Sequence, residues 1–280
     1  MRLLVVNPNI SSDVTELIRA EAERSAAPTT DLVVRTAPRG VEYIETRFES
    51  LLAAEAVAEV IAEHRDEVDG VVVAAFGDPG MPALKELVDI PVIGITEAAL
   101  CAAALQGSRF SIIAISDRIT AWYRECVEHF GFAGRLASIR SVKEALRGIG
   151  TVQDDFRPTL VELARLAVAE DGADVVVLAG APLAGLARDV ASEIPVPVVD
   201  GIGAGIRLAE AVVGLRSGAH RAGSFAVPPP KRRAGLAKVI DAALDERQLA
   251  ARPVAAPSEA TPMAASAGSS AASLERGDLS

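Results

Sequence analysis

The stretch VVVAAFGDPG, residues 71–80, decides how this sequence folds. A short run of β-branched apolar residues stops at Phe76, and glycine, aspartate and proline follow at once. This pattern is typical of a buried parallel strand that enters a tight turn and then a helix. Ligands of open α/β sheets bind at such carboxyl ends of strands. The turn is therefore the first candidate for a functional site.

A second copy of this pattern lies about one hundred residues further on, in VVVLAGAP, residues 175–182. Ile90-Pro91-Val92 likewise matches Ile194-Pro195-Val196. Strand-like and helix-like segments alternate through both halves, which predicts parallel sheets with helices on their faces. The expected strands are 2–6, 31–36, the run that begins at 71 and ends at the turn from Phe76, 91–95, 109–115, 136–142, 173–179 and 195–199. The expected helices include 96–105, 156–168, 182–191 and 203–213.

The fold class is therefore α/β, with two pseudosymmetric lobes whose strand ends face each other across a cleft. We expect the first lobe at residues 1–105 and the second at residues 106–215, with the last helix free to pack on the first lobe. An extension at residues 216–252 contains a possible amphipathic helix. The segment 253–280 is rich in Ala, Ser, Pro and Gly and has few large apolar side chains, so we expect disorder there.

Composition excludes several classes of protein. The 280 residues are 50% apolar and 24% charged, as in a soluble globular protein. The net charge of −10 disfavours nucleic acid and anionic membranes as partners. No apolar run approaches the roughly 20 residues of a membrane span, so we expect a cytoplasmic protein. Cys101 and Cys126 lie in helical segments, are expected to be buried hydrophobes, and provide neither disulfide nor metal site.

Four motifs in a fixed order carry a resemblance to a known family. They are Asn7-Pro8-Asn9, Phe76-Gly77-Asp78-Pro79-Gly80, Ile95-Thr96-Glu97-Ala98-Ala99 and Asp200-Gly201. Together they resemble the hydantoin and allantoin racemases of the aspartate/glutamate racemase superfamily, over roughly residues 1–215. The resemblance implies the two-lobed fold, a small-molecule substrate, no cofactor and a homo-oligomer.

The resemblance also implies a two-base reaction. One thiol on each side of the substrate carbon exchanges a proton, and the carbon inverts through a planar carbanion or enolate. The family pattern places its first cysteine directly before Phe-Gly-Asp-Pro-Gly and its second after the matching strand of the second lobe. This sequence has Ala75 and Gly180 there. Neither residue has a side chain that can give or take a proton, so the cysteine mechanism does not transfer to this chain.

Three other residues are candidates for acid–base chemistry. Asp78 is either a base with a raised pKa or a cap of the helix that follows its turn. Glu97 is either a second acid–base group or a first-turn carboxylate stabilised by the helix dipole. Tyr43 either protonates an enolate, orients a carbonyl group, or belongs to a solvated loop.

The remaining candidates would bind the substrate. Asn7 and Asn9 would offer amide hydrogen bonds or cap a turn. Backbone N–H groups of the two glycine-rich turns would stabilise an enolate. The full predicted binding set is Asn7, Asn9, Ile44, Ala75, Phe76, Gly77, Gly180, Ala181 and Pro182, and no metal is expected.

The sequence leaves two hypotheses of different classes. The first is a hydantoin racemase-like enzyme that acts on a small cyclic amide or an amino-acid-derived carboxylate through an enolate-type intermediate. On the same scaffold the reaction would alternatively be an isomerisation, a decarboxylation or a hydrolysis. The second is a catalytically silent protein that binds a small ligand, since fold alone does not fix function.

Overall fold

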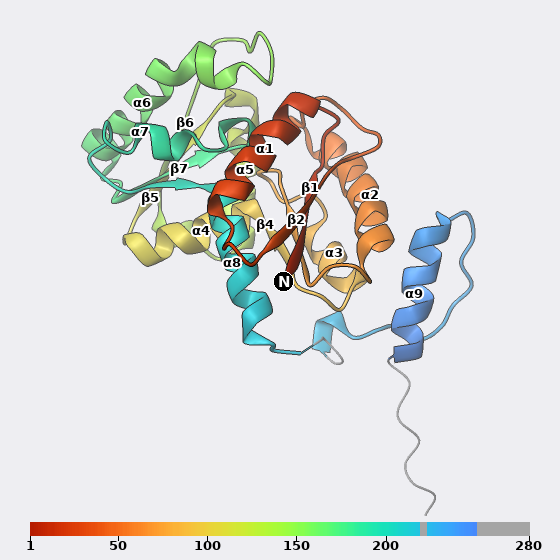
Figure 1. The fold of residues 1–280 in the computed structure, drawn as a ribbon. Helices are drawn as coiled ribbons and strands as arrows, with labels where there is room; N and C mark the ends of the chain where they lie inside the picture. Colours follow the sequence, from red (N-terminus) through yellow and green to blue (C-terminus); the bar gives the residue numbers. More distant parts are fainter. Residues whose placement is uncertain (219–222, 251–280) are drawn as a thin grey trace, which may run out of the picture.

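Two four-stranded parallel sheets form the framework of the protein (Figure 1). The computed structural model describes residues 1–218 and 223–250, so the prediction for residues 253–280 lies outside the described residues. In the first sheet the order is β2 (Asp31–Thr36), β1 (Arg2–Asn7), β3 (Gly70–Val73) and β4 (Val92–Gly94). In the second it is β6 (Leu136–Ser141), β5 (Phe110–Ala114), β7 (Val175–Ala179) and β8 (Val198–Asp200). The predicted α/β fold with two equivalent lobes is confirmed.

Helices cover both faces of the first sheet and connect it to the second. The helices of the first lobe are α1 (Ser12–Ser25), α2 (Arg47–His64), α3 (Met81–Leu87) and α4 (Ile95–Gln106). The second lobe has α5 (Thr120–His129), α6 (Val152–Asp171) and α7 (Leu186–Val190). The helix α8 (Gly201–Leu215) follows β8 and packs mainly on α4 and α1 of the first lobe, and α9 (Lys238–Ala250) comes last. Figure 1 shows α8 running back from the second lobe beside α4, and α9 beside α2.

The apolar strand β3 is buried on both faces, as the continuous valine run predicts. Val72 belongs to a core that continues through the second lobe, whereas Val71 and Val73 belong to a second core beneath α2, α3 and α9. All three valines are fully buried. Each contributes about 1.5–3 kcal/mol relative to an exposed side chain. The central strand therefore joins two apolar layers.

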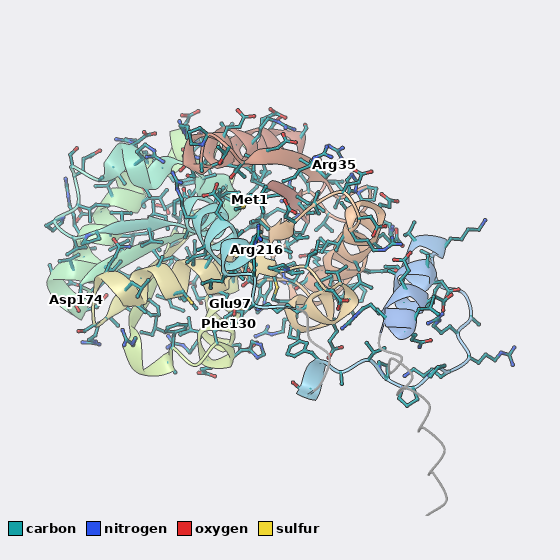
Figure 2. The ribbon with its side chains drawn as sticks, turned by 60° about the horizontal axis from the view of Figure 1, so that its bottom comes forward. Met1, Arg35, Glu97, Phe130, Asp174 and Arg216 are labelled. Carbon is teal, nitrogen blue, oxygen red and sulfur yellow. The ribbon has the colours of Figure 1, made fainter. Side chains whose placement is uncertain are left out.

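The strands point their carboxyl ends toward the boundary between the lobes. Asp174, which precedes β7, lies at the outer end of the second lobe in Figure 2, so β7 runs inward from there. Val6 of β1 pairs with Val73 of β3, and Ala114 of β5 pairs with Ala179 of β7. The turns after β3 and β7, which the sequence analysis selected, consequently lie at corresponding edges of the two sheets.

Polar contacts fasten the lobes to each other. The buried carboxylate of Glu21 in α1 accepts a hydrogen bond from Arg188 of α7 at 2.8 Å. Arg47 of α2 forms an ion pair with Glu125 of α5. Each of these contacts joins a residue of the first lobe to a residue of the second lobe. Together they restrict rotation of one lobe against the other. No helix within the described residues has the length and the apolar run that crossing a membrane requires.

One predicted helix is interrupted. The segment 182–191 forms a short 3-10 helix, Ala181–Leu183, and then α7. The break occurs at Gly185, whose N–H donates to Asp200 Oδ2 at 2.5 Å. Asp200 also accepts from the N–H groups of Ile202 and Gly203 and so caps α8. A contact from a neighbouring strand end therefore takes the N–H that a continuous helix would have used.

We predict that the cap of α2 is worth about 1 kcal/mol of unfolding free energy. Thr46 Oγ1 accepts the N–H of Glu49 at 3.1 Å, and Glu49 Oε2 accepts the N–H of Thr46 at 2.9 Å. Thr46→Ala should lower the unfolding free energy by that amount in urea titrations. Thr29→Ala is the control, because Thr29 is exposed and its side chain makes no hydrogen bond within the described residues. Equal losses in the two variants would contradict the assignment.

Candidate functional site

Asp78 lies in the turn after β3 and has a left-handed backbone conformation, with φ of +45°. Its carboxylate is buried and accepts the N–H of Thr96 on Oδ1 at 2.9 Å and the N–H of Glu97 on Oδ2 at 2.8 Å. Both donors belong to the first turn of α4. Asp78 is therefore a cap, but of α4 and not of α3, the helix that follows its turn in the sequence. The helix that Asp78 caps lies beside it in space because β4 pairs with β3.

Gly94 makes room for the Asp78 carboxylate. A Cβ atom at position 94 would lie 2.2 Å from Asp78 Cγ, so no other residue fits there without displacing the carboxylate. Thr96 adds a return bond, since its Oγ1 accepts the N–H of Gly77 at 2.7 Å. The Gly77 N–H is therefore occupied, which corrects the prediction that it would stabilise an enolate.

Burial raises the pKa of Asp78 to about 7, although the N–H groups of Glu97 and Thr96 oppose this shift. Glu97 itself has a different surrounding. Its carboxylate forms an ion pair with Lys85 of α3, 2.6 Å from Nζ. Of the two predicted acid–base carboxylates, only that of Asp78 is buried. Its pKa lies in the range that suits a general base at neutral pH.

The turns after the two central strands present backbone N–H groups without acceptors. Those of Ala75 and Phe76 follow β3, and those of Gly180 and Ala181 follow β7. None of the four has a hydrogen-bond acceptor among the described residues. Since buried N–H groups are nearly always paired, such groups indicate a place for water or for the oxygen atoms of a ligand.

Positions 75 and 180 carry no titratable side chain. Ala75 is 9% exposed. Gly180 has φ of +119°, a conformation that L-residues rarely adopt, and a Cβ built there would meet only Pro182 Cδ, at 3.5 Å. The space beside Gly180 is otherwise open. Ala181 and Pro182, the next two predicted residues, are buried at the start of the short 3-10 helix.

The side-chain amide of Asn7 is used inside its own loop. Asn7 Nδ2 has three acceptors, which are Asn9 Oδ1 at 2.9 Å, Thr15 Oγ1 at 2.9 Å and Ser11 O at 3.1 Å. Asn9 Oδ1 also accepts the N–H of Ser11. Both asparagines are buried and hold the turn between β1 and α1 in place. This arrangement gives Asn7 a positioning role and not the donor role expected of it.

Tyr43 approaches the site from the segment between β2 and α2. Its hydroxyl is buried and has no hydrogen-bond partner among the described residues. Burial raises its pKa, and the nearby carboxylates of Glu45 and Glu49 add to the shift. The neighbouring residue Ile44 is buried in the same apolar cluster as Ala75 and Phe76.

The sequence analysis did not place α5 at the site. Tyr123 of α5 packs on Phe76 with ring centroids 4.7 Å apart, and the Cys126 Sγ lies 3.8 Å from the carbonyl oxygen of Gly77. Burial raises the pKa of Cys126 to about 12, and the carboxylate of Asp78 acts in the same direction. The positions 122, 123 and 126 share one face of a helix, which is the only signal in the sequence that predicts such a contact.

Comparisons with known proteins agree with this geometry. The family model described as Asp/Glu/Hydantoin racemase matches residues 3–209. A hydantoin racemase of Paenarthrobacter aurescens is 37% identical over 234 residues, which cover 83% of this chain and 99% of the relative. The structure of an allantoin racemase from Klebsiella pneumoniae is 34% identical, with a TM-score of 0.81 and coverage of 86% of this chain and 98% of that one. An allantoin racemase from Pseudomonas fluorescens gives 34% identity, a TM-score of 0.79 and coverage of 84% and 100%.

The raised pKa of Asp78 predicts a pH dependence of stability. An acid whose pKa is higher in the folded state than in the unfolded state stabilises the protein below its unfolded pKa of about 3.9, and that stability is lost as the pH rises through about 7. The loss is on the order of 4 kcal/mol between pH 4 and pH 8. Urea titrations across this range should show a smaller pH dependence in Asp78→Asn than in the wild type. Identical slopes would contradict the assignment.

The backbone conformation of Gly180 predicts that a residue with a Cβ atom would destabilise the protein there. The open space around Gly180 does not predict this effect. Gly180→Ala should lower the unfolding free energy by about 1–3 kcal/mol, because alanine is strained at this φ. Gly134→Ala is the matched control, since Gly134 has no heavy atom within 4 Å of a built Cβ and no positive φ. Chemical denaturation of both variants tests the difference. An unaffected Gly180→Ala variant would show that the turn can relax.

Proposed function

This chain belongs to the Asp/Glu/Hydantoin racemase family, and from that premise we propose that it acts on a small cyclic amide or an amino-acid-derived carboxylate. The substrate binds between the lobes, at the turns after β3 and β7. The reaction is a proton transfer at the carbon next to a carbonyl group, and it passes through an enolate. No cofactor takes part in the proposed reaction.

The observation that carries the proposal is a set of four N–H groups without acceptors within residues 1–218 and 223–250, at Ala75, Phe76, Gly180 and Ala181. When the C–H bond breaks, its electron pair moves toward the carbonyl carbon and negative charge collects on the carbonyl oxygen. Fixed N–H donors aimed at such an oxygen stabilise the transition state more than the ground state. Two such turns suit a ring with two carbonyl groups. These groups flank either the reacting carbon or a nitrogen atom of the ring.

Asp78 is the proposed base. It takes the proton as the C–H bond breaks, and its pKa of about 7 leaves a large fraction ionised at neutral pH. Each of its oxygens accepts one N–H and retains a second lone pair. Glu97 acts through its N–H, which holds Asp78 in place, so we propose a positioning role for it.

The proton returns to the carbon from Asp78 on one face or from water on the other. The open space beside Gly180, where the resemblance places a thiol, suits such a water molecule. Return to the second face inverts the carbon and leaves hydroxide, which the proton released from Asp78 converts back to water. Tyr43 stays protonated because its pKa is raised, so we assign it the second of its predicted roles, which is to orient a carbonyl group.

A second candidate function is ligand binding without turnover. It is favoured by one specific observation, namely that both oxygens of Asp78 already serve as caps while positions 75 and 180 carry no acid or base.

In either case we propose a cytoplasmic homo-oligomer. The exposed Phe48 and Leu51 on α2 offer an apolar face for contact between copies.

Proton NMR in D2O tests the proposed reaction with 5-substituted hydantoins and allantoin. The wild type should remove the signal of the ring C–H faster than an enzyme-free blank, with a rate that rises through about pH 7. Asp78→Asn should slow the exchange by about 100-fold or more, whereas Asp189→Asn, at an exposed position in α7, should not. Exchange that matches the blank, together with ligand-induced melting shifts, would favour the binding protein.

A further inference from the structure

One face of α5 in the second lobe lies against the turn after β3 in the first lobe. Its contacts are made by Trp122 and Cys126, which are about one helical turn apart. A Cβ atom at position 77 would lie 2.3 Å from Cζ2 of Trp122, so the indole ring rests on the backbone of Gly77. The Cys126 thiol donates a weak hydrogen bond to the Gly77 carbonyl oxygen, with Sγ 3.8 Å from it. A helix of one lobe therefore holds a turn of the other.

The backbone of this turn has an uncommon conformation. Gly77, Asp78 and Gly80 have φ of +108°, +45° and +71°. Within residues 1–218 and 223–250, Asp78 and Arg216 are the only residues other than glycine with a positive φ. Such conformations cost free energy, and they persist where the surrounding contacts hold them in place. The turn that carries the proposed base therefore depends on its neighbours for its shape.

The Cys126 thiol holds the peptide group that joins Gly77 to Asp78. The carbonyl oxygen of this group accepts from the thiol, and its N–H, which belongs to Asp78, donates to the carbonyl oxygen of Ala75 at 3.2 Å. The N–H of Gly77, in the preceding peptide group, donates to Thr96. Burial raises the pKa of Cys126 to about 12, so the thiol stays protonated and remains a donor at neutral pH. Without the sulfur atom, the carbonyl end of this peptide group would lose its contact with α5.

The same face of α5 shields Asp78 from solvent. A cavity of about 220 Å³ between α3 and α5 has Asp78, Trp122 and Cys126 in its lining. Asp78 is only 6% exposed, and burial is the main cause of its raised pKa. A looser α5 would let water reach the carboxylate from this cavity. The titratable side chains around Asp78 come from α3, α4 and α5, and are Lys85, Glu97, Tyr123, Glu125, Cys126 and His129.

Resting on the proposed function, we propose that Cys126 and Trp122 are positioning residues for Asp78. The thiol fixes the peptide group that leads into Asp78, and the indole ring fills the space beside Gly77. Neither side chain touches the substrate or carries the transferred proton. Proton transfer by a base of the first lobe thereby depends on a helix of the second.

The two cysteines of the chain provide a matched pair of variants for steady-state exchange with hydantoins in D2O. Cys126→Ala should lower kcat about 5-fold to 10-fold, the change expected of one lost hydrogen bond. KM should change by less than about 2-fold, because the thiol acts on the base and not on the substrate. Cys126→Ser keeps a donor and should recover most of the lost kcat. Cys101→Ala, at a partly exposed position of α4, should match the wild type in both constants.

A titration of Asp78 provides a readout that does not require turnover. Among the carboxyl 13C signals of aspartate-labelled protein, the one that Asp78→Asn removes belongs to Asp78. In the wild type this signal should titrate near pH 7. Its midpoint should fall in Cys126→Ala and in Trp122→Phe, because entering water reduces the desolvation that raises this pKa. Cys101→Ala should leave the midpoint in place, and so would a purely structural loss that only lowers the melting temperature.

The results separate this inference from the proposed function. Wild-type kcat and an unchanged Asp78 midpoint in Cys126→Ala would overturn the positioning role. A raised KM with unchanged kcat would also overturn it, because Cys126 would then contact the substrate. If the wild type exchanges no hydantoin proton but the midpoint falls in Cys126→Ala, the proposed function fails and the positioning of Asp78 by α5 stands.

Discussion

The buried carboxylate of Asp78 fixes the relation between the turn after β3 and the start of α4. It holds two N–H groups of α4, Gly94 provides the space that it needs, and Thr96 returns a hydrogen bond to Gly77. A helix N-terminus has N–H groups without intrahelical partners, and an acceptor from outside the helix must satisfy them. Because one side chain supplies both bonds, the shape of the candidate site depends on this contact.

The same contact explains why the turn after β3 offers only some of its N–H groups. Gly77 donates to Thr96, whereas Ala75 and Phe76 have no acceptor among the described residues. In the second lobe Asp200 holds Gly185 and the start of α8. The N–H groups of Gly180 and Ala181 have no acceptor in the part of the chain that the structure describes. Each lobe thus uses an aspartate, the buried Asp78 and the half-buried Asp200, to brace the segment beyond its central strand. The pKa of Asp200, like that of Asp78, is raised by burial, to about 6.

Membership in the racemase family and the side chains at the site lead to different expectations. The family model spans both lobes, and relatives called hydantoin or allantoin racemases match more than four fifths of the chain. Yet Ala75 and Gly180 carry no proton, so any proton transfer in this chain uses other groups. Asp78 has a pKa that suits a general base, but its carboxylate also caps α4. Whether one carboxylate performs both roles is the central chemical question about the protein. The positive φ of Gly180 is a further constraint at that turn, because a residue with a Cβ atom would be strained there.

The sequence by itself determined the order of strands and helices, the parallel sheets and the two equivalent lobes, because runs of buried valine and glycine-rich turns are local signals. It also determined that positions 75 and 180 lack acids and bases. Only the tertiary structure decided that Asp78 caps α4, that Cys126 lies against the Gly77 carbonyl, and that Asp200 interrupts the helix expected at residues 182–191. Each of these contacts joins residues that are distant in the sequence. Their geometry follows from strand pairing and from the packing of one lobe on the other, which no local pattern encodes.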